Sequence, residues 1–142
     1  MKVFAGRITG FGGGVLFFCP NTERFLWLKR SADSDEPGTW CVPGGGIENH
    51  ETIEQGVARE CREEIGYREP LDLLHMYRDV QPDFVYHNHL TKVDREFTPV
   101  LNDEHTEYLW AQQPPPPIHP RLAYSLEQWV KRFRGGNHGT NC

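Results

Sequence analysis

The order of hydrophobic and polar residues predicts several short strands and two helices. Apolar or alternating stretches bounded by turn residues are typical of strands, and they lie at 11–18, 24–30, 71–80, 84–93 and 108–110. The turn Pro20–Glu23 separates the first two stretches, which are therefore expected to pair as a hairpin. Helical periodicity is confined to two other regions, one in the middle of the chain and one near its end.

The first predicted helix begins after Thr52 and ends at Gly66. Thr52 and Gln55 form a capping box, and Gly66 can adopt the left-handed conformation that terminates helices. At about 100° per residue, the apolar residues of this helix fall on one stripe, formed by Ile53, Val57, Cys61 and Ile65. One side of the helix is therefore expected to be buried.

Three carboxylates of this helix do not lie opposite the apolar stripe. Glu60 projects at its border and Glu63 just beyond it. Glu64 falls between the projections of Ile53 and Val57, on the side of the helix that is expected to be buried. Because an unpaired buried carboxylate costs several kcal/mol, Glu64 needs a partner that neutralises its charge. Oxygen ligands alone suit Mg²⁺ or Mn²⁺ better than zinc. A solvated acidic helix is the alternative interpretation.

The second predicted helix is amphipathic and runs from Arg121 to Phe133. Its apolar face consists of Leu122, Leu126, Trp129, Val130 and Phe133. The four prolines at 114–117 form a stiff spacer inside the domain, because a helix still follows them. We therefore expect a single domain over residues 1–134, followed by a disordered tail at 135–142.

Composition narrows the class of protein. A chain of 142 residues with 37% hydrophobic and 25% charged residues fits one globular domain. The net charge of −5 argues against binding to a nucleic-acid backbone, and no apolar run approaches the length of a membrane span. The four cysteines contain no CxxC pair, which favours reduced thiols in a cytoplasmic protein.

His87 and His89 would lie on one face of a predicted strand and could bind a metal. No Cys, His or carboxylate follows them at a supporting spacing. A role at the surface or in a substrate pocket is therefore the favoured interpretation.

The stretch Gly45–Tyr67 resembles the signature of the Nudix hydrolases, GX5EX7REUXEEXGU. All seven fixed positions match, and chance agreement in this chain is on the order of one in a million. Cys61 and Tyr67 stand where a bulky aliphatic residue is usual, but neither is a ligand position.

The resemblance implies a Nudix fold, an α/β architecture with a mixed β-sheet sandwiched between helices. The implied activity is that of a pyrophosphohydrolase: metal-dependent cleavage of the pyrophosphate bond in a nucleoside diphosphate linked to another group, by attack of water at phosphorus. Mg²⁺ or Mn²⁺ would be the cofactor, a small nucleotide the substrate, and a homodimer a family-level expectation. A non-catalytic Nudix-like binding or regulatory module is the alternative, and the identity of the nucleotide stays open.

The same resemblance assigns the site residues. Its metal ligands would be the Gly44 carbonyl with Glu60, Glu63 and Glu64. Its catalytic group would comprise Glu51, Arg59, Glu63 and Glu104. Arg59 would orient carboxylates, and Glu104, with Glu107 as its substitute, would be a further ligand or the general base. The substrate would contact Arg30 and the glycine loop at Gly45.

Overall fold

The computed structural model describes the backbone of residues 10–138 and the side chains of residues 10–130. In chain order the elements are β1 (Gly10–Cys19), β2 (Arg24–Arg30), β3 (Trp40–Cys41), β4 (Gly44–Ile47), α1 (Ile53–Ile65), β5 (Leu74–Gln81), β6 (Phe84–Lys92), β7 (His105–Ala111) and α2 (Pro120–His138). The first residues of the tail expected at 135–142 belong to α2, which extends to His138. Residues 139–142 lie outside the described part of the chain.

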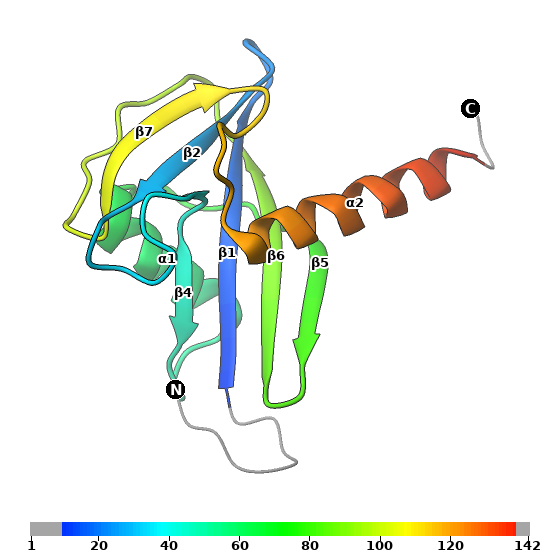
Figure 1. Ribbon diagram of the computed structural model, residues 1–142, viewed down its shortest axis with the longest axis horizontal. Helices are drawn as coiled ribbons and strands as arrows, with labels where there is room; N and C mark the ends of the chain where they lie inside the picture. Colours follow the sequence, from blue (N-terminus) through cyan, green and yellow to red (C-terminus); the bar gives the residue numbers. More distant parts are fainter. Residues whose placement is uncertain (1–9, 139–142) are drawn as a thin grey trace.

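The seven strands form one mixed sheet, which confirms the expected fold class. Its order is β3-β2-β1-β6-β5, with β4 paired to β1 and β7 paired to β2. The pairing of β1 with β6 is parallel, whereas the other pairings are antiparallel. Figure 1 shows α2 crossing in front of β6 and β5, and α1 behind the sheet.

The predicted hairpin between the first two strands is present, with Phe18 opposite Phe25. The glycine-rich run after Pro43, which the sequence suggests is a loop, instead forms β4 along β1, with Gly45 opposite Gly13. The two backbones are very close, because a Cβ built on Gly44 would lie 2.5 Å from the carbonyl oxygen of Gly13. Glycine on both strands therefore makes this pairing sterically feasible.

Helix α1 has the ends that its sequence predicts. Thr52 and Gln55 form the capping box, and Gly66 is left-handed with φ of 68°. Val57, Cys61 and Ile65 of the apolar stripe are buried against β1 and β2. Gly56 faces β4, where a Cβ would collide with the Ile47 side chain, so its missing side chain allows the helix to approach that strand.

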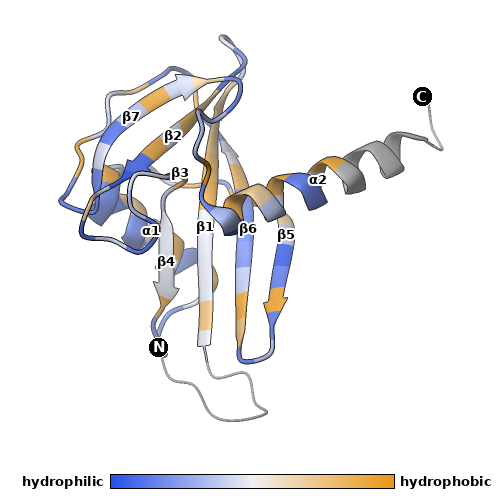
Figure 2. Cartoon of the chain, viewed as in Figure 1, coloured by the Kyte–Doolittle hydropathy of each residue, from blue (hydrophilic) through white to orange (hydrophobic). Residues whose placement is uncertain are grey.

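Two apolar clusters stabilise the sheet, one on each face. The larger lies under α1 and contains Val15, Phe17, Leu26, Leu28, Val57 and Ile65. The smaller lies under α2 and contains Leu16, Trp27 and Trp40, with Leu122 and Leu126 packed against it. Figure 2 shows β2 changing from hydrophobic residues to charged ones at its end, where Arg30 leaves the core.

Helix α2 covers the sheet with its first turns only. Val130, expected on the apolar face, is 38% exposed, and the side chain of Phe133 lies outside the described residues. Among the elements described, no helix is long and apolar enough to cross a membrane. The thiols of Cys19, Cys41 and Cys61 are free and buried.

Removing a core side chain should test the packing under α1. We expect Leu28→Ala to lower the free energy of unfolding by about 2–5 kcal/mol, because Leu28 is fully buried between β1, β2 and α1. Leu109→Ala on the paired strand β7 is the matched control, because Leu109 is 40% exposed. Urea denaturation measures both values, and equal losses would contradict the assigned core.

Candidate active site

Arg59 of α1 is the centre of a network of carboxylates. Its Nε donates to Glu51 Oε2 at 2.7 Å and its Nη2 donates to Glu51 Oε1 at 3.1 Å. Nη2 also donates to the carbonyl oxygen of Gly46 at 2.9 Å, which ties the helix to β4. The hydrogen bonds from Arg59, together with the backbone N–H of Glu48, lower the pKa of Glu51 from 4.5 to about 2.

The same guanidinium reaches the carboxylates of the following turn. Arg59 Nη1 lies 3.4 Å from Glu60 Oε2 and 3.3 Å from Glu63 Oε1. Glu51, Glu60 and Glu63 together raise the pKa of Arg59, so it stays cationic. Arg59 therefore fixes the side chains of acids on both sides of it, a geometry suited to a positioning role.

Glu60 and Glu64 converge on the glycines of β4. Glu64 is only 2% exposed, and its Oε1 accepts a hydrogen bond from the Gly44 N–H at 3.2 Å. The Glu60 carboxylate lies directly against Gly45, where any Cβ would overlap it. Burial, and then the neighbouring Glu60 carboxylate, raises the pKa of Glu64 well above its ordinary value.

This pair of carboxylates offers donor atoms of the kind that a hard divalent cation binds. The buried Glu64 and the partly buried Glu60 offer oxygen donors at a position where positive charge would be favoured. Such a donor set fits Mg²⁺ or Mn²⁺ and contains none of the nitrogen or sulfur ligands that zinc prefers.

Glu63 does not join this pair in the structure. Its side chain is 53% exposed and turns back to Arg59. Within residues 10–130, one group of three offers ligand atoms within 4.8 Å of one another, and it consists of Glu48, His50 and Glu51 before α1. Both oxygens of Glu51 already accept hydrogen bonds from Arg59, so this exposed group is a poor cation site.

Glu104 lies in the loop before β7 and is exposed. Asn102 fixes this loop, because its Oδ1 accepts from the Glu104 N–H at 3.0 Å and its Nδ2 lies 3.4 Å from Glu104 Oε2. The Glu104 charge contributes, after burial and Glu60, to the raised pKa of Glu64. Glu107, the candidate substitute, instead pairs with Lys29 at 3.3 Å.

A pocket of about 230 Å³ opens beside the carboxylate pair. Gly44 and Gly45 line it at one end, next to the carboxylates, and Arg30 lines it from the end of β2. Arg30 Nε donates to the backbone carbonyl of Asp35, which holds the guanidinium at the pocket. Glycine backbone, two arginines and polar side chains thus surround a space large enough for part of a nucleotide, with the carboxylates of α1 behind the glycines.

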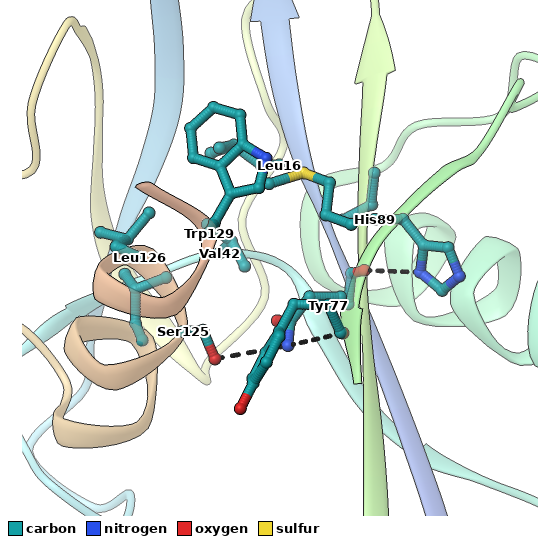
Figure 3. A pocket seen from close by; sticks show the side chains of 12 residues that line it. Leu16, Val42, Tyr77, His89, Ser125, Leu126 and Trp129 are labelled. Carbon is teal, nitrogen blue, oxygen red and sulfur yellow. Dashed lines mark hydrogen bonds between the residues drawn. The ribbon is translucent and has the colours of Figure 1, made fainter. Parts of the chain in front are cut away.

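The far wall of the pocket is polar and comes from β5, β6 and α2. Arg121 Nε donates to Asp79 Oδ2 at 2.9 Å, and Asn88 Nδ2 donates to Ser125 Oγ at 3.3 Å. Figure 3, a view of the adjoining apolar pocket under α2, shows Ser125 of α2 turned toward the strands of the sheet. His119 completes the wall, where burial and the nearby Arg30 lower its pKa.

Sequence reasoning missed most of this wall. Asp79 and Arg121 lie 42 positions apart, and neither belongs to a motif. The signal that existed was regional, because Tyr86 and Asn88 lie in the strand predicted at 84–93 and His119 lies just before the second predicted helix. Only the pairing of β5 with β6 and the docking of α2 bring these residues together.

Comparisons with known proteins agree with this geometry. The family model for the NUDIX domain matches residues 11–130, so the chain belongs to the Nudix family. Nucleoside triphosphatase NudI of Klebsiella pneumoniae (strain 342) is 32% identical over 115 residues, which cover 66% of this chain and 79% of that protein. The family and its hydrolase relatives identify the chain as an enzyme, a Nudix-type pyrophosphohydrolase.

Solved structures support the same fold. The MutT NUDIX hydrolase from Burkholderia pseudomallei has a TM-score of 0.67 and 26% identity, covering 84% of this chain and 96% of that one. The NUDIX hydrolase from Nitrosomonas europaea has a TM-score of 0.72 and 24% identity, covering 91% of this chain and 74% of that one. Both likenesses extend over nearly the whole described part of the chain.

The Glu51–Arg59 pair should stabilise the fold in a pH-dependent way. We expect Glu51→Gln to lower the free energy of unfolding by about 1.5–3 kcal/mol at neutral pH, the range for hydrogen bonds to charged groups. The pKa of Glu51 is lowered from 4.5 to about 2, so its contribution is complete above pH 4.5 and disappears as the pH falls toward 2.

Denaturation of both proteins from pH 7 down to pH 2 measures this difference. Glu107→Gln is the control, because the exposed Lys29–Glu107 pair should contribute little at any pH. A Glu51→Gln loss that stays constant between pH 5 and pH 2 would contradict the assigned interaction.

Proposed function

We propose that this enzyme hydrolyses nucleoside triphosphates and requires Mg²⁺ or Mn²⁺. The observation that supports it is the pair of the buried Glu64 and the partly buried Glu60, which contact the glycines of β4 that line the pocket. A relative 32% identical to this chain is named a nucleoside triphosphatase, which supports this substrate class.

The carboxylates of α1 would hold the cation, together with the Gly44 carbonyl and with Glu63 once it turns from Arg59. A bound Mg²⁺ supplies positive charge that offsets the repulsion between a polyphosphate and the attacking water. Arg59 and Glu51 act as positioning residues, because they fix the carboxylates without lying in the pocket wall.

The remaining steps belong to side chains around the pocket. Arg30 would donate hydrogen bonds to a phosphate, since its guanidinium lines the pocket on the side of β2. Glu104 would accept the proton of the attacking water as the new P–O bond forms and the bridging P–O bond breaks. The far wall would contact the nucleoside, and the domain at residues 1–134 would carry the whole reaction.

Substitution of the buried carboxylate tests the proposal directly. We expect Glu64→Gln to lower turnover of nucleoside triphosphates at saturating Mg²⁺ by at least about a hundredfold, because it removes a charged ligand. Glu107→Gln should retain nearly full turnover, since its carboxylate pairs with Lys29. Circular dichroism of each variant separates a loss of chemistry from a loss of fold.

The assay uses a panel of nucleoside triphosphates, with chromatography of the nucleotide product. Phosphate release measured with and without added inorganic pyrophosphatase shows whether pyrophosphate or phosphate leaves. Wild-type protein that hydrolyses no nucleotide of the panel in Mg²⁺ or Mn²⁺ would overturn the proposed substrate class. Glu64→Gln protein with wild-type turnover would overturn the ligand assignment alone.

The assignment of the base rests on Glu104. We expect Glu104→Gln to lower the turnover number by roughly a hundredfold with little change in KM, because general base catalysis acts in the transition state. The control is Asp103→Asn, which removes a neighbouring charge of the same loop. Steady-state kinetics measure the turnover number and KM of both variants. If Glu104→Gln lowers the turnover number no more than Asp103→Asn does, Glu104 is not the general base.

A further inference from the structure

The side chain of Tyr86 lies across glycines of the neighbouring strand. Tyr86 belongs to β6, and the parallel register places it opposite Gly12 of β1, which lies between β6 and β4 (Figure 1). A Cβ built on Gly12 would lie 2.6 Å from Cδ1 of the Tyr86 ring, and one built on Gly14 would lie 2.6 Å from the Tyr86 hydroxyl oxygen. Glycine at both positions therefore leaves room for the ring along β1.

The hydroxyl of Tyr86 ends beside the glycines of β4. A Cβ built on Gly44 would lie 2.5 Å from the same hydroxyl oxygen. The backbone N–H of Gly44 donates to Glu64, so the hydroxyl and a carboxylate of α1 both lie next to this one glycine. Gly44, Gly45, Arg30 and Tyr86 line the same pocket of about 230 Å³. The hydroxyl is therefore at the end of the pocket that adjoins the carboxylates, one strand away from the strand that carries it.

This hydroxyl has no hydrogen-bond partner in the part of the chain that the structure describes. No group among residues 10–130 donates to it or accepts from it. Within those residues, the fully buried side-chain polar atom that lacks a partner is His105 Nδ1, so the Tyr86 oxygen is not sealed from the pocket that its residue lines. Polar groups inside proteins are normally hydrogen-bonded, and a ligand in the pocket could supply the missing acceptor.

The surroundings of the hydroxyl favour a phosphate as that acceptor. A phenol keeps its proton near neutral pH, so the hydroxyl can donate a hydrogen bond. Gly44 and Gly45 have no side chains, which allows a bulky anion to approach the backbone closely. Arg30 adds positive charge to the same pocket, whereas Asn88 and Ser125 form its polar far wall. Phosphate oxygens are strong acceptors, and they fit the glycine end better than a base does.

We propose that the Tyr86 hydroxyl donates a hydrogen bond to a phosphate of the substrate at the glycine end of the pocket. Tyr86 is then a substrate-binding residue that lies outside the signature stretch Gly45–Tyr67. The inference rests on the proposed function, since it takes a nucleoside triphosphate as the ligand. It also gives Gly12, Gly14 and Gly44 a shared role, because a side chain at any of them would displace the Tyr86 ring or its hydroxyl.

The variant Tyr86→Phe tests the proposal, because it keeps the ring over the glycines and removes only the hydroxyl. The probe is a nucleoside triphosphate analogue with methylene groups in place of the bridging oxygens, so that binding is measured without hydrolysis. We expect the full-length variant to bind this analogue in Mg²⁺ about ten- to a hundredfold more weakly, the range for one hydrogen bond to a charged group. Its affinity for the nucleoside without phosphates, measured by NMR titration, should equal that of the wild type.

Tyr108→Phe is the matched control, because it removes the hydroxyl of an exposed tyrosine on β7 that does not line the pocket. It should keep the wild-type affinity for both ligands, and melting temperatures confirm that both variants fold. Tyr86→Phe protein that binds the analogue as tightly as the wild type, or that loses affinity for both ligands equally, would overturn the proposal. Wild-type protein that binds the analogue no more tightly than the nucleoside would overturn it too.

The hydrolysis assay separates this inference from the proposed function. Wild-type protein whose affinity for the analogue depends on Tyr86, but which hydrolyses no nucleoside triphosphate, would overturn the proposed activity and leave the phosphate contact in place. Active wild-type protein together with an unchanged affinity of Tyr86→Phe would overturn the phosphate contact alone.

Discussion

The burial of a carboxylate is the constraint on which the site depends. Glu64 lies among the apolar residues of α1, only 2% exposed, with the Gly44 N–H as a hydrogen-bond donor and Glu60 beside it. One N–H cannot offset the cost of burying a charge, so the surroundings favour a proton or a cation at this point. The glycines of β4 allow that strand to approach α1 closely. This close approach brings the carboxylate oxygens of the helix against the strand.

Local signals allowed much of this region to be predicted. Thr52, Gln55 and Gly66 specify where α1 begins and ends, and each acts within its own few residues. The fold class and the enzyme class follow from the signature that the same helix carries, and the family comparison confirms both. The roles of individual site residues stay predictions.

What the sequence did not reveal depends on long-range pairing. Strand β4 has a glycine-rich sequence that predicts a loop, and it is a strand only because β1 offers a glycine-rich partner. The neighbour of His87 and His89 is His75, which precedes them in the chain and reaches them only through the register of β5, including its bulge near Tyr77. Periodicity along one segment carries no information about such partners.

The ion pair between Arg121 and Asp79 has a wider consequence. It anchors α2 to β5, on the opposite side of the pocket from the carboxylates of α1. Under the proposed function, the residues for hydrolysis and those for nucleoside recognition would therefore lie on separate elements of the fold. Substitutions along the first turns of α2 could reshape the preference for one base over another while the reaction centre stays intact, which makes this helix a natural route to divergence in specificity.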